Sequence, residues 1–199
     1  MDFRTALSDL IAREAKPVDK FGHQPRLYAL TRQVGEGQDY DDDVVYAAAW
    51  LHDLGVFVGH RPEDPAALAC WDHVRYVVDR APRLLEEAGF PGEKLQAVLE
   101  AIRNHQPHDD PTTMEGVILR DADILEQLGA IGIMRQFAKV GRDSRYPTFT
   151  AAVAVMRRSV EVLPARLRLE RARTLAEPKI RILQAFLEAV DREAAPALF

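Results

Sequence analysis

Apolar residues recur along this chain at the three- and four-residue spacing of an α-helix, and this periodicity is what most restricts its fold. No run of alternating β-branched residues is long enough to predict a strand. The predicted helices cover about residues 2–15, 25–34, 44–55, 66–88, 93–105, 114–128, 131–140, 149–162 and 165–190. Pro82 is expected to kink or divide the helix over 66–88. The fold class is therefore predicted to be all-α.

A length of 199 residues is enough for one hydrophobic core, so we expect a single domain spanning 1–199. A net charge of -5 gives no general attraction to nucleic acid or to an anionic membrane. No segment approaches the ~18 consecutive apolar residues of a membrane span. The lone Cys70 excludes an intrachain disulfide, indicates the cytoplasm, and is expected to be a small buried hydrophobe. The oligomeric state is not predicted.

Polar residues interrupt the helical pattern at several points where it predicts core. The stretch YAAAWLHDLG ends a run of apolar residues in a His-Asp doublet, and other interruptions lie at the start of one apolar helix and within two more. These residues are His23, His52, Asp53, His105, Asp121 and Asp123. Such breaks in local consistency are expected at functional sites, so we expect the interruptions to share one site.

The doublet has a chemical interpretation and a structural one. A histidine nitrogen and a carboxylate oxygen that converge on one point form half of the coordination sphere of a transition metal. Alternatively, His52 caps the helix C-terminus and Asp53 begins the following loop. A buried aspartate without a partner is costly, but the doublet alone does not exclude the structural interpretation, and it is the other interruptions along the chain that favour the metal site.

The ordered motifs resemble those of the HD-domain metal-dependent phosphohydrolases. GHQPRLYAL is similar to the first motif of that family, AAAWLHDLG to the His-Asp motif, and ILRDADILEQLGAIGI to the last. WDHVRYVV and AIRNHQ occupy places where many of these proteins keep further site histidines. The resemblance spans about residues 20–140 and implies metal ligands at His23, His52, Asp53 and Asp123, with additional site histidines at His73 and His105.

The resemblance also implies a fold, a cofactor and a reaction. The fold is an HD-domain helical bundle, with the C-terminal helices over 149–190 packing on the motif core. The cofactor is one divalent ion or two, drawn from Mn, Mg, Co, Fe and Zn. The reaction is hydrolysis of a nucleotide or another small phosphate ester by a metal-activated water. The implied catalytic residues are Asp53, Arg26, His73 and His105, of which the last three also bind substrate.

Two assignments are left open by the residues themselves. Helical spacing from Ile118 and Leu125 places Asp121 on the apolar face and Asp123 elsewhere, whereas the family motif favours Asp123 as the closing ligand. We therefore assign Asp121 to orienting a ligand or capping a neighbour. Arg26, one helical turn after His23, either binds a phosphate or pairs with the acidic DYDDD cluster.

Two other functions fit the same motifs. Some HD-fold proteins use both extra histidines to hold two irons and activate oxygen, and His73 and His105 keep this alternative open. A non-catalytic signalling module is the other alternative, but it does not account for intact ligands at every motif. One departure from the family is that HDLGVFV lacks the glutamate that a nucleotidase-like branch places after the doublet. His60, Glu63 and Asp64 in the next loop are the candidates to replace it, although each is expected to be a solvated loop residue.

Overall fold

The structure of the chain is a computed structural model that describes residues 2–194 and 198. Within these residues it holds ten α-helices and no strand, apart from an isolated bridge between Val58 and Arg61. The helices are α1 (Phe3–Glu14), α2 (His23–Val34), α3 (Asp42–Leu51), α4 (Pro65–Ala69), α5 (His73–Ala88), α6 (Leu95–Arg103), α7 (Met114–Glu126), α8 (Gly129–Phe137), α9 (Phe149–Val162) and α10 (Glu170–Ala194). The all-α prediction is confirmed.

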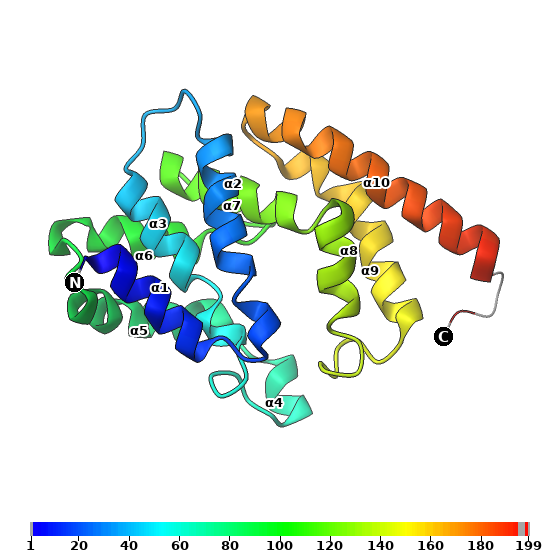
Figure 1. Cartoon of the computed structure of the whole chain (residues 1–199), viewed down its shortest axis with the longest axis horizontal. Coiled ribbons are helices and arrows are strands. Elements are labelled where there is room, and N and C mark those ends of the chain that lie inside the picture. Colours follow the sequence, from blue (N-terminus) through cyan, green and yellow to red (C-terminus); the bar gives the residue numbers. More distant parts are fainter. Residues whose placement is uncertain (1, 195–197, 199) are drawn as a thin grey trace. The chain divides into compact units, whose positions relative to one another are not determined.

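The chain divides into two compact units, one ending at Arg120 and one beginning at Asp121. In the first unit, α3 is the central helix, and it packs against α1, α2, α5 and α6 (Figure 1). Its eight residues from Val44 to Leu51 are all buried. Since a helix that is apolar on every side belongs in a core, the YAAAWL run explains why the other helices surround α3.

Capping residues set where α3 begins. The carboxylate of Asp41 accepts hydrogen bonds from the backbone N–H groups of Asp43 and Val44. Lys94 donates to Asp41 and Asp43, and Arg4 donates to Asp43 as well, so two cations from other elements pair with the acidic cluster. The cluster therefore fixes the N-terminus of α3 and joins it to α1 and to the start of α6.

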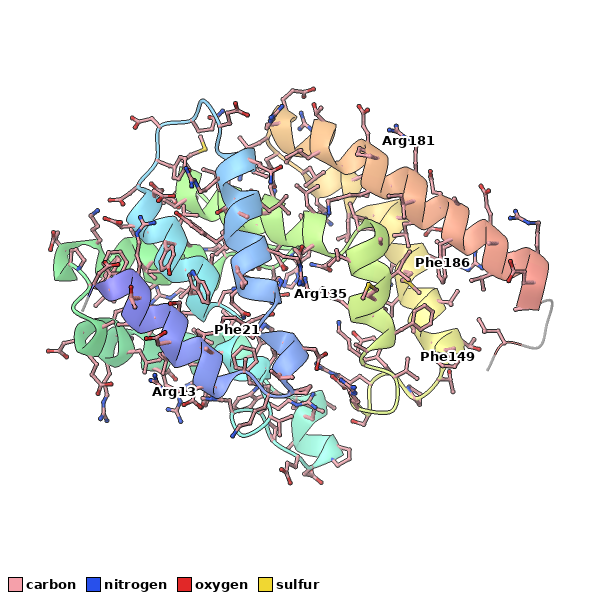
Figure 2. All side chains as sticks on the ribbon, in the orientation of Figure 1. Arg13, Phe21, Arg135, Phe149, Arg181 and Phe186 are labelled. Carbon is pink, nitrogen blue, oxygen red and sulfur yellow. The ribbon has the colours of Figure 1, made fainter. Side chains whose placement is uncertain are left out.

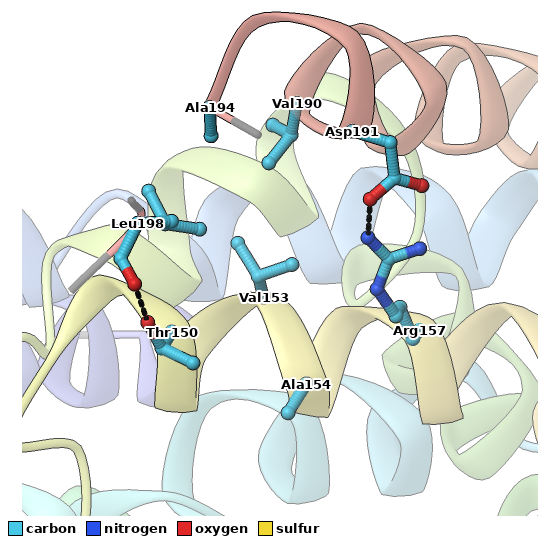
Figure 3. A pocket seen from close by; sticks show the side chains of 8 residues that line it. All are labelled: Thr150, Val153, Ala154, Arg157, Val190, Asp191, Ala194 and Leu198. Atoms are coloured by element: carbon cyan, nitrogen blue, oxygen red, sulfur yellow. Dashed lines mark hydrogen bonds and ion pairs between the residues drawn. The ribbon is translucent and has the colours of Figure 1, made fainter. Parts of the chain in front are cut away.

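In the second unit, α8, α9 and α10 pack on one another. Phe137 of α8 meets the rings of two other phenylalanines edge-on, with centroids 5.6 and 5.8 Å away. These are Phe149 of α9 and Phe186 of α10, both labelled in Figure 2. A shallow surface pocket of about 280 Å³ lies between α9 and α10, where Arg157 pairs with Asp191 (Figure 3). None of the predicted site residues lines this pocket.

Three helix predictions were wrong in their boundaries, and the first of these, over 44–55, ends at Leu51. The helix expected over 66–88 is two helices, and the break lies at residues 70–72, not at Pro82. Two hydrogen bonds account for it: the indole of Trp71 donates to the Gly55 carbonyl, 16 residues earlier, at 2.8 Å, and Asp72 caps the N–H of Arg75. Cys70 at this break is exposed, so the expectation that it is buried was also wrong.

The helix expected over 165–190 begins instead at Glu170, after a short 3-10 turn. No helix of the described chain is both long enough and apolar enough to cross a membrane.

Candidate metal centre

The His-Asp doublet lies where α3 ends. His52 still donates its backbone N–H to the Ala48 carbonyl at 2.9 Å, but the backbone of Asp53 leaves the helical region (φ -102°, ψ 9°) and a 3-10 turn follows. The turn brings both side chains to the same side of the helix end. The buried helix α3 thus ends in His52 and Asp53, whose side chains lie together at one site.

His23, at the first position of α2, joins the doublet. Its Nε2 lies 3.3 Å from Nε2 of His52, and each of these nitrogens lies 3.7 Å from Oδ2 of Asp53. The point equidistant from the three atoms is about 2.1 Å from each, within the ~2.0–2.2 Å at which imidazole nitrogens and carboxylate oxygens bind zinc. We call His23, His52 and Asp53 the first group; their spacing fits one transition-metal ion.

Backbone hydrogen bonds select which imidazole nitrogens face the site. Nδ1 of His52 lies 3.0 Å from the Ala49 carbonyl, and Nδ1 of His105 lies 2.6 Å from the Ile102 carbonyl. A carbonyl oxygen only accepts, so Nδ1 of each ring must carry the proton. Each neutral ring then presents the lone pair of Nε2, the form that binds a metal.

A second group lies on the other side of the same carboxylate. It consists of His73 at the start of α5 and His105 just past the end of α6, and together with Asp53 their donor atoms lie within 4.8 Å of one another. Oδ1 of Asp53 is 3.8 Å from Nε2 of His73, whereas Oδ2 faces the first group. Asp53 therefore lies between two sets of histidines.

Gly55 explains how His73 comes so close to the doublet. A Cβ atom at Gly55 would lie 2.8 Å from the carbonyl oxygen of His73 and 3.0 Å from its Cβ. Only a residue without a side chain lets α5 start at this distance from the turn after α3. The glycine of the HDLG sequence thus positions the second group.

The charges of the site act in opposite directions on Asp53. Burial of the carboxylate raises its pKa, but the positive charges that His52, His23, His73 and His105 can carry lower it well below the usual value of an aspartate. The net effect is to keep Asp53 ionised, as a metal ligand must be.

Gln106 is a residue of this site that the sequence analysis missed. Its amide Nε2 lies 3.0 Å from Nε2 of His73 and 3.2 Å from Nε2 of His105. It occurs in a polar loop that has no periodicity, and its position directly after His105 was the only signal in the sequence. An amide next to a site histidine in sequence is too common to carry a prediction.

Asp121 and Asp123 belong to the second unit and have different surroundings there. Asp121 is completely buried, and its Oδ2 accepts the backbone N–H groups of Arg168 and Leu169 at 2.9 and 2.8 Å. It therefore caps the chain just before α10. Asp123 is 9% exposed, accepts a hydrogen bond from Gln127 at 3.1 Å, and faces the Arg135 guanidinium at 3.9 Å.

Arg26 is exposed on α2, and its Nη1 lies 2.9 Å from where a Cβ of Gly22 would be. The acidic cluster, which was one of the two partners considered for Arg26, receives Arg4 and Lys94.

Of the three loop residues considered as replacements for a catalytic glutamate, Glu63 is exposed as expected, and the other two have structural contacts. His60 is hydrogen-bonded to Tyr76 at 2.9 Å and to Glu14 at 3.0 Å, and it connects α5 with α1. Asp64 caps α4 through the N–H of Ala67.

The first unit is all-α and places four histidines around one aspartate, and two of the rings have the tautomer that suits coordination. This arrangement is typical of proteins with a histidine-carboxylate centre for divalent metal ions. The sequence pattern of the HD domain matches residues 21–128, which is more than half of the chain. This protein belongs to the HD domain family.

Proteins similar to this one support the same fold. The uncharacterized protein YpgQ of Bacillus subtilis is 25% identical over 198 residues, covering 96% of this chain and 91% of YpgQ. The crystal structure of YpgQ in complex with ADP matches with a TM-score of 0.70 and 23% identity over 98% of this chain and 94% of that one. A predicted HD superfamily hydrolase from an uncultured Thermotogales bacterium matches with a TM-score of 0.65 and 24% identity over 96% of this chain and 93% of that one. The resemblance to the HD superfamily stated from the motifs is confirmed.

Proposed function

We propose that this protein is a metal-dependent phosphohydrolase that acts on a nucleotide or another small phosphate ester. The observation that carries the proposal is the first group, in which the donor atoms of His23, His52 and Asp53 lie at a spacing that fits one metal ion. We further propose that Asp123 closes the coordination sphere.

The donor set favours some ions over others. Two imidazole nitrogens and carboxylate oxygens suit Mn, Co, Fe and Zn, whereas Mg prefers an all-oxygen sphere and keeps its water. We propose manganese first, because a mixed set with carboxylates accepts it readily. A divalent ion bound there would lower the pKa of a coordinated water toward ~7, so that a hydroxide nucleophile is present at neutral pH, and would stabilise negative charge on the phosphoryl group.

The chain itself supplies the surroundings that the reaction needs. The histidines lower the pKa of Asp53 despite its burial, so the carboxylate is ionised at neutral pH and can act as a ligand. The imidazole of His73 is 24% exposed at the N-terminus of α5, where the helix dipole favours an anionic phosphoryl group. Arg26 is exposed near the N-terminus of α2 and can present a guanidinium fork to a phosphate. His105 is buried, and we assign it to supporting the site around His73.

The nucleotide part of the proposal has its own support. YpgQ, which is similar over almost its whole length, has been crystallised with ADP. A nucleoside phosphate offers the anionic oxygens that a divalent ion and an arginine recognise. We therefore propose a nucleoside phosphate as the substrate class.

The test is metal analysis of the purified protein, followed by phosphate release from a panel of nucleotides with Mn, Co or Mg. Asp53→Ala should lose both metal retention and turnover, because it removes the ligand shared by both groups. Asp79→Ala is the matched control, since this aspartate is exposed and only faces Arg75 at 3.9 Å. Metal retention or turnover at the wild-type level in Asp53→Ala would refute the assigned role.

A diiron oxygenase is the second candidate, and the observation that favours it is the second group beside Asp53. Imidazole and carboxylate ligands with open positions also suit iron and oxygen activation. Protein isolated with two irons per chain and an oxygen-sensitive optical spectrum would favour this activity over phosphate-ester hydrolysis.

A further inference from the structure

The amide of Gln106 lies where the two histidines of the second group would receive a cation. Its Nε2 is within 3.0 Å of Nε2 of His73 and within 3.2 Å of Nε2 of His105. The same two nitrogens are the donor atoms that this group offers to a metal ion. The amide and an ion would thus compete for the same two nitrogen atoms, one on each imidazole.

The hydrogen-bond pattern fixes the orientation of this amide. His105 carries its proton on Nδ1, which donates to the Ile102 carbonyl, so its Nε2 can only accept. The nitrogen of an amide donates two hydrogen bonds and accepts none, so it suits two imidazole lone pairs at once. With Oε1 in that place instead, His105 would have to be doubly protonated. The amide nitrogen therefore donates to Nε2 of His105, and it lies within hydrogen-bond distance of Nε2 of His73 as well.

The backbone around Gln106 is also held. Its N–H donates to the Asp109 carboxylate at 2.9 Å, and its carbonyl accepts the N–H of Asp109 at 3.0 Å. The buried Arg120 donates in turn to the Asp109 carbonyl at 2.8 Å. This reciprocal turn keeps the side chain beside the second group, so an ion can enter there only if it displaces the amide.

We propose that Gln106 closes the second group to metal ions. The wild-type chain then retains one divalent ion, in the first group. Under the same conditions, a chain that lacks this amide retains two. The inference rests on the metal binding of the proposed function but not on its hydrolytic activity. Gln106 thereby determines the metal stoichiometry and disfavours a two-iron centre.

The experiment is a titration of metal-free protein with Mn(II), in which calorimetry measures the affinity of each ion. Metal analysis after gel filtration measures the number of ions retained, and electron paramagnetic resonance detects coupling between neighbouring ions. We expect one ion per wild-type chain. Gln106→Glu has nearly the same shape, but it cannot donate to the lone pairs and adds an anionic ligand, so it should bind a second ion on the order of 10-fold or more tighter than wild type does. Its electron paramagnetic resonance spectrum should show a coupled pair. Gln106→Ala should also bind a second ion, more weakly.

Two variants serve as controls. Gln33→Glu makes the same charge change on the exposed side of α2, where Gln33 only reaches the Ala29 carbonyl at 3.4 Å, and it should stay at one ion. His105→Ala combined with Gln106→Glu removes a donor of the second group and should return to one ion. Circular dichroism establishes that each variant is folded.

The proposal is overturned if wild type takes up two ions with similar affinity, or if both Gln106 variants fold and bind only one. In the first case hydrolysis of a nucleotide would still support the proposed function, so the two failures are distinguishable. Absence of any bound ion in wild type would overturn both.

Discussion

Gly55→Ala tests whether close approach of the backbone positions the second group. The new methyl carbon would lie 2.8, 3.0 and 3.1 Å from the carbonyl oxygen, Cβ and Cα of His73. Ordinary contacts of this kind lie at ~3.5 Å, so the start of α5 must move by about half an ångström. Two of these three atoms belong to the backbone, so a side-chain rotation cannot relieve the overlap.

The magnitude follows from two opposing contributions. Overpacking of a buried site costs about 1–3 kcal/mol, whereas replacing glycine by alanine at a negative φ stabilises by about 0.4–1 kcal/mol through the unfolded chain. Gly55 is buried and is not among the glycines with positive φ, so both contributions apply. We expect the free energy of unfolding to fall by about 1–2 kcal/mol.

Denaturant unfolding of metal-free protein measures this change, and calorimetric titration with Mn(II) measures the site. Gly92→Ala is the matched control, because nothing lies within 4 Å of its new methyl carbon and its φ is not positive. This control should be as stable as wild type or slightly more stable. If Gly55→Ala matched the control in stability and bound metal like wild type, the reasoning would be refuted.

Three further predictions concern stability. Asp121→Ala should lower the free energy of unfolding by about 2–3 kcal/mol, because the N–H groups of Arg168 and Leu169 lose their acceptor, whereas Asp121→Asn should cost less; equal losses in urea unfolding would contradict the capping role. Removing the ion with a chelator should lower Tm, and Mn(II) at 100 times its Kd should restore about 2.7 kcal/mol in wild type but nothing in Asp53→Ala, as scanning fluorimetry would show. In metal-free protein the lowered pKa of Asp53 contributes stability that is complete above the ~3.9 of an unfolded aspartate and is lost as pH falls through the folded value. Asp53→Asn should therefore give a shallower acid side in a profile of unfolding free energy against pH, and an unchanged slope would count against this contribution.

Helix positions could be predicted where the apolar pattern is strong and the caps are local. The predicted helix over 149–162 coincides with α9, and the cap that begins it is local, since Thr148 accepts the N–H of Ala151. The break at residues 70–72 could not be predicted, because it depends on the bond between Trp71 and Gly55, which are far apart in sequence. The late start of α10 has the same cause, since the backbone N–H groups of Arg168 and Leu169, just before the helix, donate to Asp121, which is far away in sequence.

The residues of the candidate site could be predicted in kind but not in arrangement. The histidines and Asp53 were visible because each interrupts an apolar pattern or completes a motif. Their division into two groups on either side of one carboxylate depends on which oxygen faces which ring, and sequence periodicity carries no such information. Gln106 could not be predicted because its role depends on a contact between α5 and the loop after α6.

The bonds from His52 and His105 to carbonyls three residues earlier have a consequence for the order of events during assembly. These carbonyls lie in the last turns of α3 and α6, where carbonyl groups have no backbone N–H donor within the helix. Formation of each helix end therefore also determines which imidazole nitrogen carries the proton. A nascent chain, whose imidazoles exchange freely between tautomers, lacks this selection. An ion that binds through Nε2 of these two rings would therefore find both lone pairs presented only once the ends of α3 and α6 have formed, so the proposed metal site would depend on the folded chain.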